Sequence, residues 1–171
     1  MATKQIMFND AALLEMKKGV DRLADAVKCT MGPSGRHVVI EKSYGGPHIT
    51  KDGVSVSKEI TLPEPFQSMG AKMVNEVAKR TADKAGDGTT AATVLAQAIF
   101  TEGLRHVAAG ANPVLLHRGI NKAADAVAAA IDAMAIKCKG REDYKKVATV
   151  SANHDSAIGD LIAEAIAKVG A

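Results

Sequence analysis

Aromatic side chains are scarce in this sequence: Phe, Tyr and Trp together make up 3% of the 171 residues, and Trp is absent. Apolar residues nevertheless account for 47% of the chain. A core must therefore be built from Ala and aliphatic side chains, without the large rings that fill many sheet cores. This composition favours packed helices over a β-sandwich.

Cysteine is nearly as rare, with Cys29 and Cys138 far apart and in no Cys-x-x-Cys or Cys/His arrangement. The five histidines share no ligand spacing with one another or with the cysteines, so no zinc site is predicted. We expect two reduced thiols that act as small hydrophobes, as is usual in the cytoplasm.

Long apolar runs and targeting segments are also missing. Residues 1–8 contain neither Arg nor a continuous apolar stretch, so we expect no signal peptide and no transit peptide. No run approaches the roughly 20 apolar residues that a membrane-spanning helix needs. The sequence therefore predicts a soluble cytoplasmic protein without a membrane partner.

The charge is balanced rather than one-sided. Lys and Arg number 22 against 19 Asp and Glu, giving a net charge of +3. Nucleic-acid binders usually carry a concentrated basic surface, with aromatic residues that stack on bases where they bind single strands. Neither feature is present, so no nucleic-acid partner is predicted.

Apolar residues recur at intervals of three and four, which predicts a mainly helical chain. Helices are expected to begin near residues 9, 65, 89, 113, 142 and 155, and residues 37–41 and 48–51 are expected to form two strands of a hairpin. We predict that Asn9 and Asp10 cap the first helix and that Asn112 caps the one starting at Pro113. Met69 and Met73, at helical spacing, are interpreted as core residues.

The most informative segment is the loop Gly86-Asp87-Gly88-Thr89-Thr90, directly before a predicted helix. A helix N-terminus has unpaired N–H groups and a partial positive charge, which favour a phosphate. The glycines let the backbone approach an anion, the threonines carry hydroxyls, and Asp87 suits a hard cation such as Mg²⁺. The alternative is a plain connection with Asp87 or Thr89 as the helix cap. No Walker-type phosphate loop occurs in the sequence.

Two further loops carry suitable chemistry. Residues 30–36 end the first helix with a turn framed by glycines, which is also what an ordinary helix C-cap and connection require. In residues 49–53, Lys51 is suited to meeting a phosphate and Asp52 to orienting or deprotonating a water. The alternative is an Asp-Gly turn with a solvated Lys51. When each loop is considered by itself, the helix C-cap and the Asp-Gly turn are the better interpretations.

Taken together, these segments resemble a known family. Residues 30–36 (TMGPSGR), 49–56 (ITKDGVSV) and 85–95 (AGDGTTAATVL) are similar to the N-terminal nucleotide-binding segments of the group I chaperonins, the GroEL family. GANP at 110–113 and VSAN at 150–153 fit the same family in the same order. The resemblance covers essentially the whole chain.

The resemblance implies an ATP-hydrolysing subunit of seven-membered rings that enclose unfolded proteins, usually with a lid co-chaperonin. Residues 1–136 are similar to the first half of the helical equatorial domain, with its small hairpin, and 137–171 to the beginning of the intermediate domain. The resemblance also implies residue roles. Asp87 is the expected Mg²⁺ ligand, Asp52 supports hydrolysis, and the nucleotide is lined by the following residues: Thr30, Met31, Gly32, Pro33, Lys51, Asp87, Gly88, Thr89 and Thr90.

Some positions depart from the family pattern. Ser34 stands where the family usually has Lys, Met31 where it has Leu, and Ala91 where it has a third threonine. The chain is also truncated relative to the family, without the apical domain, the second half of the equatorial domain or the other catalytic aspartate. We therefore expect that the chain shares its ancestry with an ATPase. We do not expect these residues alone to sustain ATP hydrolysis. The alternative is a non-catalytic paralogue that acts only as an interaction module.

Overall fold

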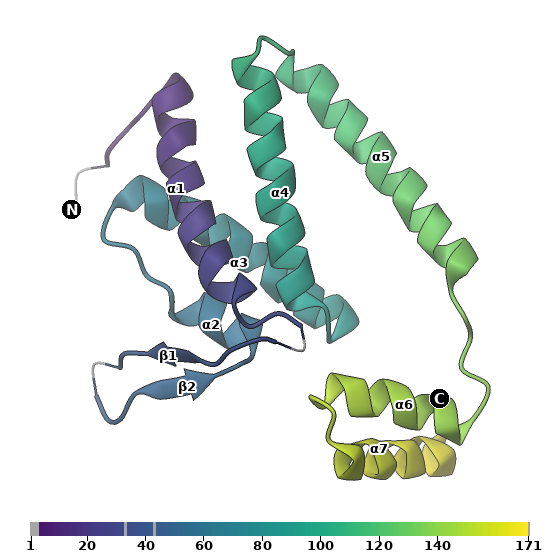
Figure 1. Ribbon diagram of the computed structural model, residues 1–171. Helices are drawn as coiled ribbons and strands as arrows, with labels where there is room; N and C mark the ends of the chain where they lie inside the picture. The colour runs from purple at the N-terminus through teal and green to yellow at the C-terminus, as the bar shows by residue number, and fades with distance from the viewer. Residues whose placement is uncertain (1–3, 33, 43, 171) are drawn as a thin grey trace. The chain divides into compact units, whose positions relative to one another are not determined.

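The computed structural model describes residues 4–32, 34–42 and 44–170. The elements that it contains are, in chain order, α1 (Asn9–Lys28), β1 (Val38–Ile40), β2 (His48–Thr50), α2 (Gly53–Glu59), α3 (Pro65–Ala85), α4 (Thr89–Ala108), α5 (Pro113–Met134), α6 (Arg141–Ser151) and α7 (Ser156–Val169). The predicted mainly helical class with one hairpin is confirmed (Figure 1). None of the helices within the described ranges is long and apolar enough to cross a bilayer.

The chain divides into two compact units, Met1–Leu116 and His117–Ala171. The first unit holds α1 to α4 and the hairpin, and the division falls inside α5. The predicted domain boundary after residue 136 refers to domains of a whole family member and stays a prediction.

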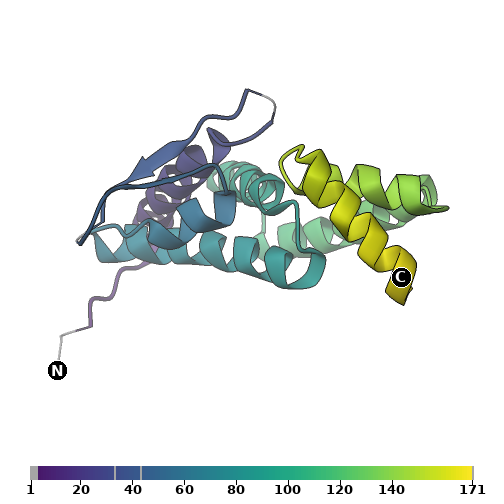
Figure 2. The same cartoon turned by 90° about the horizontal axis from the view of Figure 1, so that it is seen from below.

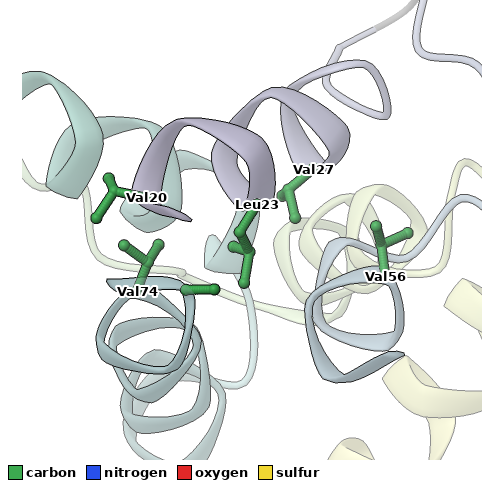
Figure 3. Close-up of a cluster of buried hydrophobic side chains, with 6 residues drawn as sticks. Val20, Leu23, Val27, Val56 and Val74 are labelled. Atoms are coloured by element: carbon green, nitrogen blue, oxygen red, sulfur yellow. The ribbon is translucent and has the colours of Figure 1, made fainter. Parts of the chain in front are cut away.

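The core of the first unit is an aliphatic cluster between α1, α2 and α3. Figure 3 shows Val20, Leu23 and Val27 of α1 close to Val74 of α3 and Val56 of α2. All five side chains are at most 4% exposed. Burying a Val or Leu side chain stabilises a fold by about 1.5–3 kcal/mol, so this cluster fixes how the three helices meet. The six buried residues of the cluster are all aliphatic, in line with the composition, and Phe100 of α4 packs against them.

Helices α1 and α3 cross with their backbones nearly in contact, at a glycine on each helix. A Cβ on Gly19 would lie 1.8 Å from the carbonyl oxygen of Gln67, and one on Gly70 would lie 2.0 Å from that of Met16. Neither position can hold a side chain without moving one helix away from the other. Beside the crossing, Gln67 Nε2 donates to Glu15 Oε2 at 2.8 Å.

The crossing also explains why Met69 and Met73 are not core residues. The buried row of α3 consists of Phe66, Gln67, Gly70, Ala71, Val74 and Ala78. Met69 and Met73 are 51% and 56% exposed, so the prediction for them was wrong. Close backbone approach selects the row with the smaller side chains, and helical spacing alone does not reveal which row the neighbouring helix will cover.

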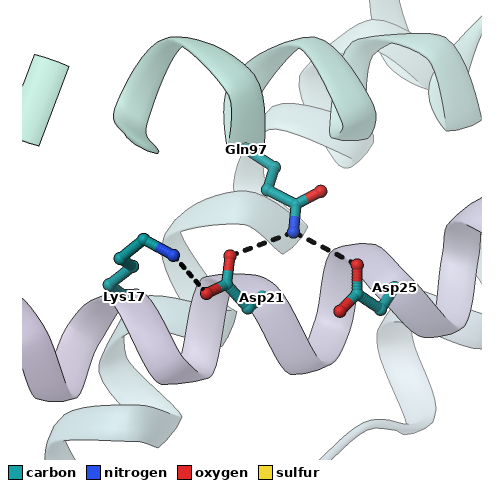
Figure 4. A network of polar contacts seen from close by, with 4 residues as sticks. All are labelled: Lys17, Asp21, Asp25 and Gln97. Carbon is teal, nitrogen blue, oxygen red and sulfur yellow. Dashed lines mark hydrogen bonds and ion pairs between the residues drawn. The ribbon is translucent and has the colours of Figure 1, made fainter. Parts of the chain in front are cut away.

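A polar network connects α1 to α4 (Figure 4). Gln97 Nε2 donates to Asp21 Oδ1 at 3.0 Å and to Asp25 Oδ1 at 3.2 Å. Lys17 Nζ lies 2.5 Å from Asp21 Oδ2. Partial burial raises the pKa of Asp21, but the hydrogen bonds from Lys17 and Gln97 outweigh it, so the pKa lies below its usual value. The network therefore holds α4 beside α1 with charge-assisted bonds.

The hairpin packs on the α2 side of the first unit, as Figures 1 and 2 both show. Its strands pair antiparallel, with Val39 opposite Ile49. Val39 and Ile49 are 65% and 60% exposed, whereas Val38 and Ile40 pack against the aliphatic cluster. One face of the hairpin therefore joins the core and the other is open.

The helix starts only partly match the sequence. Asn112 Oδ1 accepts from the backbone N–H of Val114 at 2.9 Å, which confirms its capping role. The first helix differs, because Phe8 occupies its N-cap position and no side chain caps it. Asn9 has φ of 57°, so the prediction that Asn9 and Asp10 cap α1 was wrong.

In the second unit, α6 and α7 pack against each other. Ala148 of α6 and Ala163 of α7 are buried between them, and Lys145 Nζ lies 2.7 Å from Asp160 Oδ1. Asp155 Oδ1 caps α7 by accepting from the backbone N–H of Ala157 at 2.9 Å. Helix α5 has no buried residue.

We predict that Gly19→Ala lowers the free energy of unfolding by about 3 kcal/mol, because overpacking a tight contact costs about 1–3 kcal/mol or more. The measurement is urea unfolding followed by circular dichroism at 222 nm.

The matched control is Gly103→Ala in α4, where the added Cβ would only touch Leu116 Cδ2 at 3.9 Å. It should stabilise the helix by about 0.5–1 kcal/mol, since Ala is the better helix former. Equal effects of the two substitutions would show that the crossing is not tight.

Candidate functional site

The three predicted loops lie at one place in the first unit, where α1 ends and α2 and α4 begin. Gly53, the first residue of α2, marks the contact: a Cβ there would lie 2.3 Å from Thr90 Oγ1 and 3.1 Å from Val27 Cγ1. Val27 belongs to the last turn of α1, just before Thr30, and Thr90 to the first turn of α4. Segments up to 63 residues apart in sequence (27 to 90) are thus brought together.

The first loop is a defined turn rather than an open chain. Thr30 is 6% exposed, and its Oγ1 donates to the Val27 carbonyl at 2.7 Å. Across the turn, the Arg36 N–H donates to the Cys29 carbonyl at 2.8 Å. Met31 is half-exposed, so a ligand here would meet backbone and the Met31 side chain. Pro33 lies outside the described residues.

The second loop differs from the Asp-Gly turn that the sequence allowed. Strand β2 ends at Thr50, and Asp52 is the N-cap of α2, a helix that the sequence reasoning missed. Asp52 Oδ2 accepts from the Ser55 backbone N–H at 2.8 Å and from Ser55 Oγ at 2.6 Å. Lys51, directly before it, is partly exposed. Asp, a preferred N-cap residue, is the signal at this position that could have indicated the start of α2.

Hydrogen bonds set the direction in which the pKa of Asp52 is shifted. Partial desolvation raises its pKa, but bonds from the Ser55 hydroxyl and the Ser55 and Val54 amides outweigh this. The pKa of Asp52 therefore lies below its usual value, with a smaller contribution from the Lys58 charge. Asp52 is a carboxylate at neutral pH, as a group that accepts a proton or a hydrogen bond from water must be.

The third loop opens onto the start of α4. Gly86 and Gly88 have φ of 74° and 80°, values that favour glycine over any residue with a Cβ. The Gly88 N–H donates to Asp87 Oδ1 at 2.6 Å. Gly88 is the N-cap of α4 and no side chain caps this helix, so the alternative with Asp87 or Thr89 as cap is wrong. The N–H groups of the first turn of α4 therefore face the loop.

The donor set suits a phosphate with a hard cation. The three loops contribute backbone N–H groups, the Lys51 ammonium, threonine hydroxyls and two carboxylates. Within the described ranges, no three or more His, Cys, Asp or Glu side chains gather as a metal site would require. Mg²⁺ commonly uses one or two carboxylates and completes its shell with phosphate oxygens and water. Asp87, a carboxylate next to a helix N-terminus, suits a Mg²⁺ ion that is also bound by phosphate and water. It does not suit a Mg²⁺ site in which the protein supplies all the ligands.

Sequence and structure comparisons give a consistent result. Residues 23–171 match the model of the TCP-1/cpn60 chaperonin family. A crystal structure of a group III chaperonin in the open state is similar with a TM-score of 0.78 and 27% identity, over 93% of this chain and 32% of that one. The chaperonin gp146 from the bacteriophage EL, crystallised in the presence of ATP-BeFx, is similar with a TM-score of 0.75 and 28% identity, over 94% of this chain and 28% of that one. This chain spans about a third of the length of these structures.

We predict that Gly53→Ala destabilises the first unit by about 1–3 kcal/mol through overpacking, and that Thr90→Ala partly relieves the cost. The double variant removes Oγ1, the nearest atom to the new Cβ. The four proteins form a double-mutant cycle, measured by urea unfolding.

The control is Gly46→Ala in the hairpin loop, where an added Cβ meets nothing within 4 Å. Strictly additive effects of Gly53→Ala and Thr90→Ala would contradict the close contact between α2 and α4.

A second prediction concerns pH. The pKa of folded Asp52 lies below the unfolded value of about 3.9, so its carboxylate stabilises the fold above about pH 3.9 and loses this effect as the pH falls through the folded pKa. Asp52→Asn should therefore destabilise the protein at pH 7 and approach the unfolding free energy of the wild type at the acid end of the range.

Urea unfolding at a series of pH values measures this difference. Asp83→Asn, on the exposed end of α3, controls for the loss of one negative charge and should change stability by less than about 0.5 kcal/mol. A difference between Asp52→Asn and wild type that does not depend on pH would contradict the role of the charge.

Proposed function

This chain belongs to the TCP-1/cpn60 chaperonin family, and from that premise we propose that it supplies part of the ATP site of a chaperonin subunit that assists protein folding. ATP and Mg²⁺ bind at the three loops. Asp87 holds the metal, Lys51 and the start of α4 hold phosphates, and the residues from Thr30 to Pro33 line the nucleotide. Asp52 supports hydrolysis.

One observation carries the proposal: Gly53 is packed directly against Thr90 and Val27. This contact brings the cap residue Asp52 to the same place as the glycine loop before α4 and the end of α1. The residue types that suit a phosphate and a hard cation are thereby gathered in one region, as an ATP site requires. The similarity to a chaperonin crystallised in the presence of ATP-BeFx supports nucleotide as the ligand class.

The wider activity is proposed for a whole subunit, because this chain spans about a third of the similar structures. We propose assembly into a homo-oligomeric ring in the cytoplasm, with unfolded proteins as substrates and a lid co-chaperonin as partner. The lid follows from the group I resemblance. Sustained ATP hydrolysis belongs to that assembly rather than to these residues alone.

A non-catalytic interaction module is the second candidate. It is favoured by the exposed apolar side chains of α5, among them Val127, Ile131 and Met134, which are each more than half exposed. Exposed apolar residues of this kind are typical of surfaces that meet other protein. The two candidates differ in whether the three loops bind nucleotide.

Nucleotide binding predicts that saturating ATP with Mg²⁺ raises the melting temperature of the chain. A ligand at about a hundred times its Kd stabilises the folded state by about 2.7 kcal/mol, which corresponds to several degrees for a protein of this size. Differential scanning fluorimetry at several ATP concentrations, with and without Mg²⁺, measures the shift.

Two substitutions at Asp87 distinguish its charge, which would bind the metal, from its hydrogen bond to the Gly88 N–H within the loop. Asp87→Asn keeps an oxygen for the Gly88 N–H and removes the charge, whereas Asp87→Ala removes both. Both should lose the Mg²⁺-dependent part of the shift, and Asp83→Ala should keep it. If millimolar ATP does not shift the melting temperature of the wild-type protein, nucleotide binding is contradicted. The non-catalytic interaction module would then be the favoured function.

A further inference from the structure

The Asp52 carboxylate is held by a side chain to which neither the family resemblance nor the proposed function gives a role. Ser55 makes two bonds to the same oxygen, Asp52 Oδ2: its hydroxyl lies 2.6 Å away and its backbone N–H donates at 2.8 Å. The backbone bond is the ordinary cap of a helix. The hydroxyl bond is additional, and a cap alone does not need it.

Helix α2, which carries Ser55, is itself fixed on three sides. Val56 is completely buried in the aliphatic cluster. Ser57 Oγ lies 2.9 Å from the Val54 carbonyl and 3.0 Å from Asn75 Oδ1 of α3. Gly53 is packed against Thr90 of α4. A group bound to Ser55 is therefore fixed relative to the loop before α4.

We infer that Ser55 is a positioning residue, whose hydroxyl holds the Asp52 carboxylate in one orientation toward the nucleotide site. This role rests on the proposed function, because it gives Asp52 a phosphate or water to act on. Catalytic groups must be held to within about 0.5 Å by neighbouring hydrogen bonds. Without the hydroxyl, Asp52 keeps only bonds from backbone amides, and its side chain gains freedom to rotate.

The geometry also accounts for the charge state. The Ser55 hydroxyl is the largest of the influences that lower the pKa of Asp52, ahead of the Ser55 and Val54 amides and of Lys58. A donor to the carboxylate favours its ionised form, so the pKa of Asp52 reports whether the Ser55 hydroxyl bond is made.

The first experiment needs no nucleotide. The Asp52 carboxyl carbon is titrated by ¹³C NMR in wild type, Ser55→Ala, Ser55→Thr and Ser57→Ala. We expect an upward pKa shift of Asp52 in Ser55→Ala, and a value close to wild type in Ser55→Thr, which keeps a hydroxyl. Ser57→Ala removes a hydroxyl from the same helix that does not touch Asp52, so it should leave the pKa unchanged.

An unchanged pKa of Asp52 in Ser55→Ala would overturn the inference. So would equal shifts in Ser55→Ala and Ser57→Ala, because they would mean that α2 is merely loosened. Amide spectra of all four proteins show whether α2 is still folded. If Ser55→Ala unfolds, an Asp52 pKa in Ser55→Thr that rises although the hydroxyl is kept would overturn the inference.

The second experiment connects Ser55 to the site through Mn²⁺·ATP, a paramagnetic probe that replaces Mg²⁺·ATP. In wild type and Ser55→Thr, it should broaden the Asp52 carboxyl signal together with the amides of residues 87–90. In Ser55→Ala, the amides should still broaden, while the broadening of the Asp52 signal changes because the carboxylate samples several orientations.

The possible failures are distinguishable. Normal amide broadening with identical Asp52 broadening in wild type and Ser55→Ala would overturn the positioning role and leave the proposed function intact. Absence of amide broadening at residues 87–90 in wild type would overturn the proposed function. The role of Ser55 toward a nucleotide would fall with it, whatever the pH titration shows.

Discussion

The first unit depends on the crossing of α1 and α3 at Gly19 and Gly70. Because the backbones nearly touch there, the two helices have little freedom to slide or rotate against each other. The aliphatic residues on either side, such as Leu23 and Val74, then meet in one arrangement. Close packing of this kind resists small changes in volume, so the crossing acts as a fixed reference for everything built on α1.

From this reference, α1 positions the other parts of the site. Its polar face binds Gln97 of α4 through Asp21 and Asp25, and its apolar face buries Val56 of α2. The end of α1, the start of α2 and the start of α4 are consequently neighbours. The candidate nucleotide site is the outcome of three helix ends held by one central helix, and no single loop defines it.

Much of the apolar surface of these helices remains exposed, including Leu95 and Ile99 on α4 and Leu161 on α7. Aliphatic side chains in such numbers are unusual on a surface that meets only water. This is consistent with a chain that spans about a third of the structures it resembles.

The sequence by itself determined the helical class, the hairpin and the starts of most helices, because periodicity and caps such as Asn112 act over a few residues. Its motifs also identified the family and the three loops. Short-range signals failed where a distant partner decides: Met69 and Met73 were assigned to the core because their spacing does not tell which row of α3 meets α1. Helix α2 was missed because seven residues carry too little periodicity to be distinguished from a turn.

Only the tertiary structure decided that Gly53, at the start of α2, lies against Thr90, at the start of α4. This contact joins residues 37 positions apart (53 to 90), and a sequence does not state which distant segments will touch. The residue types therefore determined which chemistry each loop can carry. Packing around α1 brought the loops together into one site, because contacts between distant segments exist only once the chain has folded.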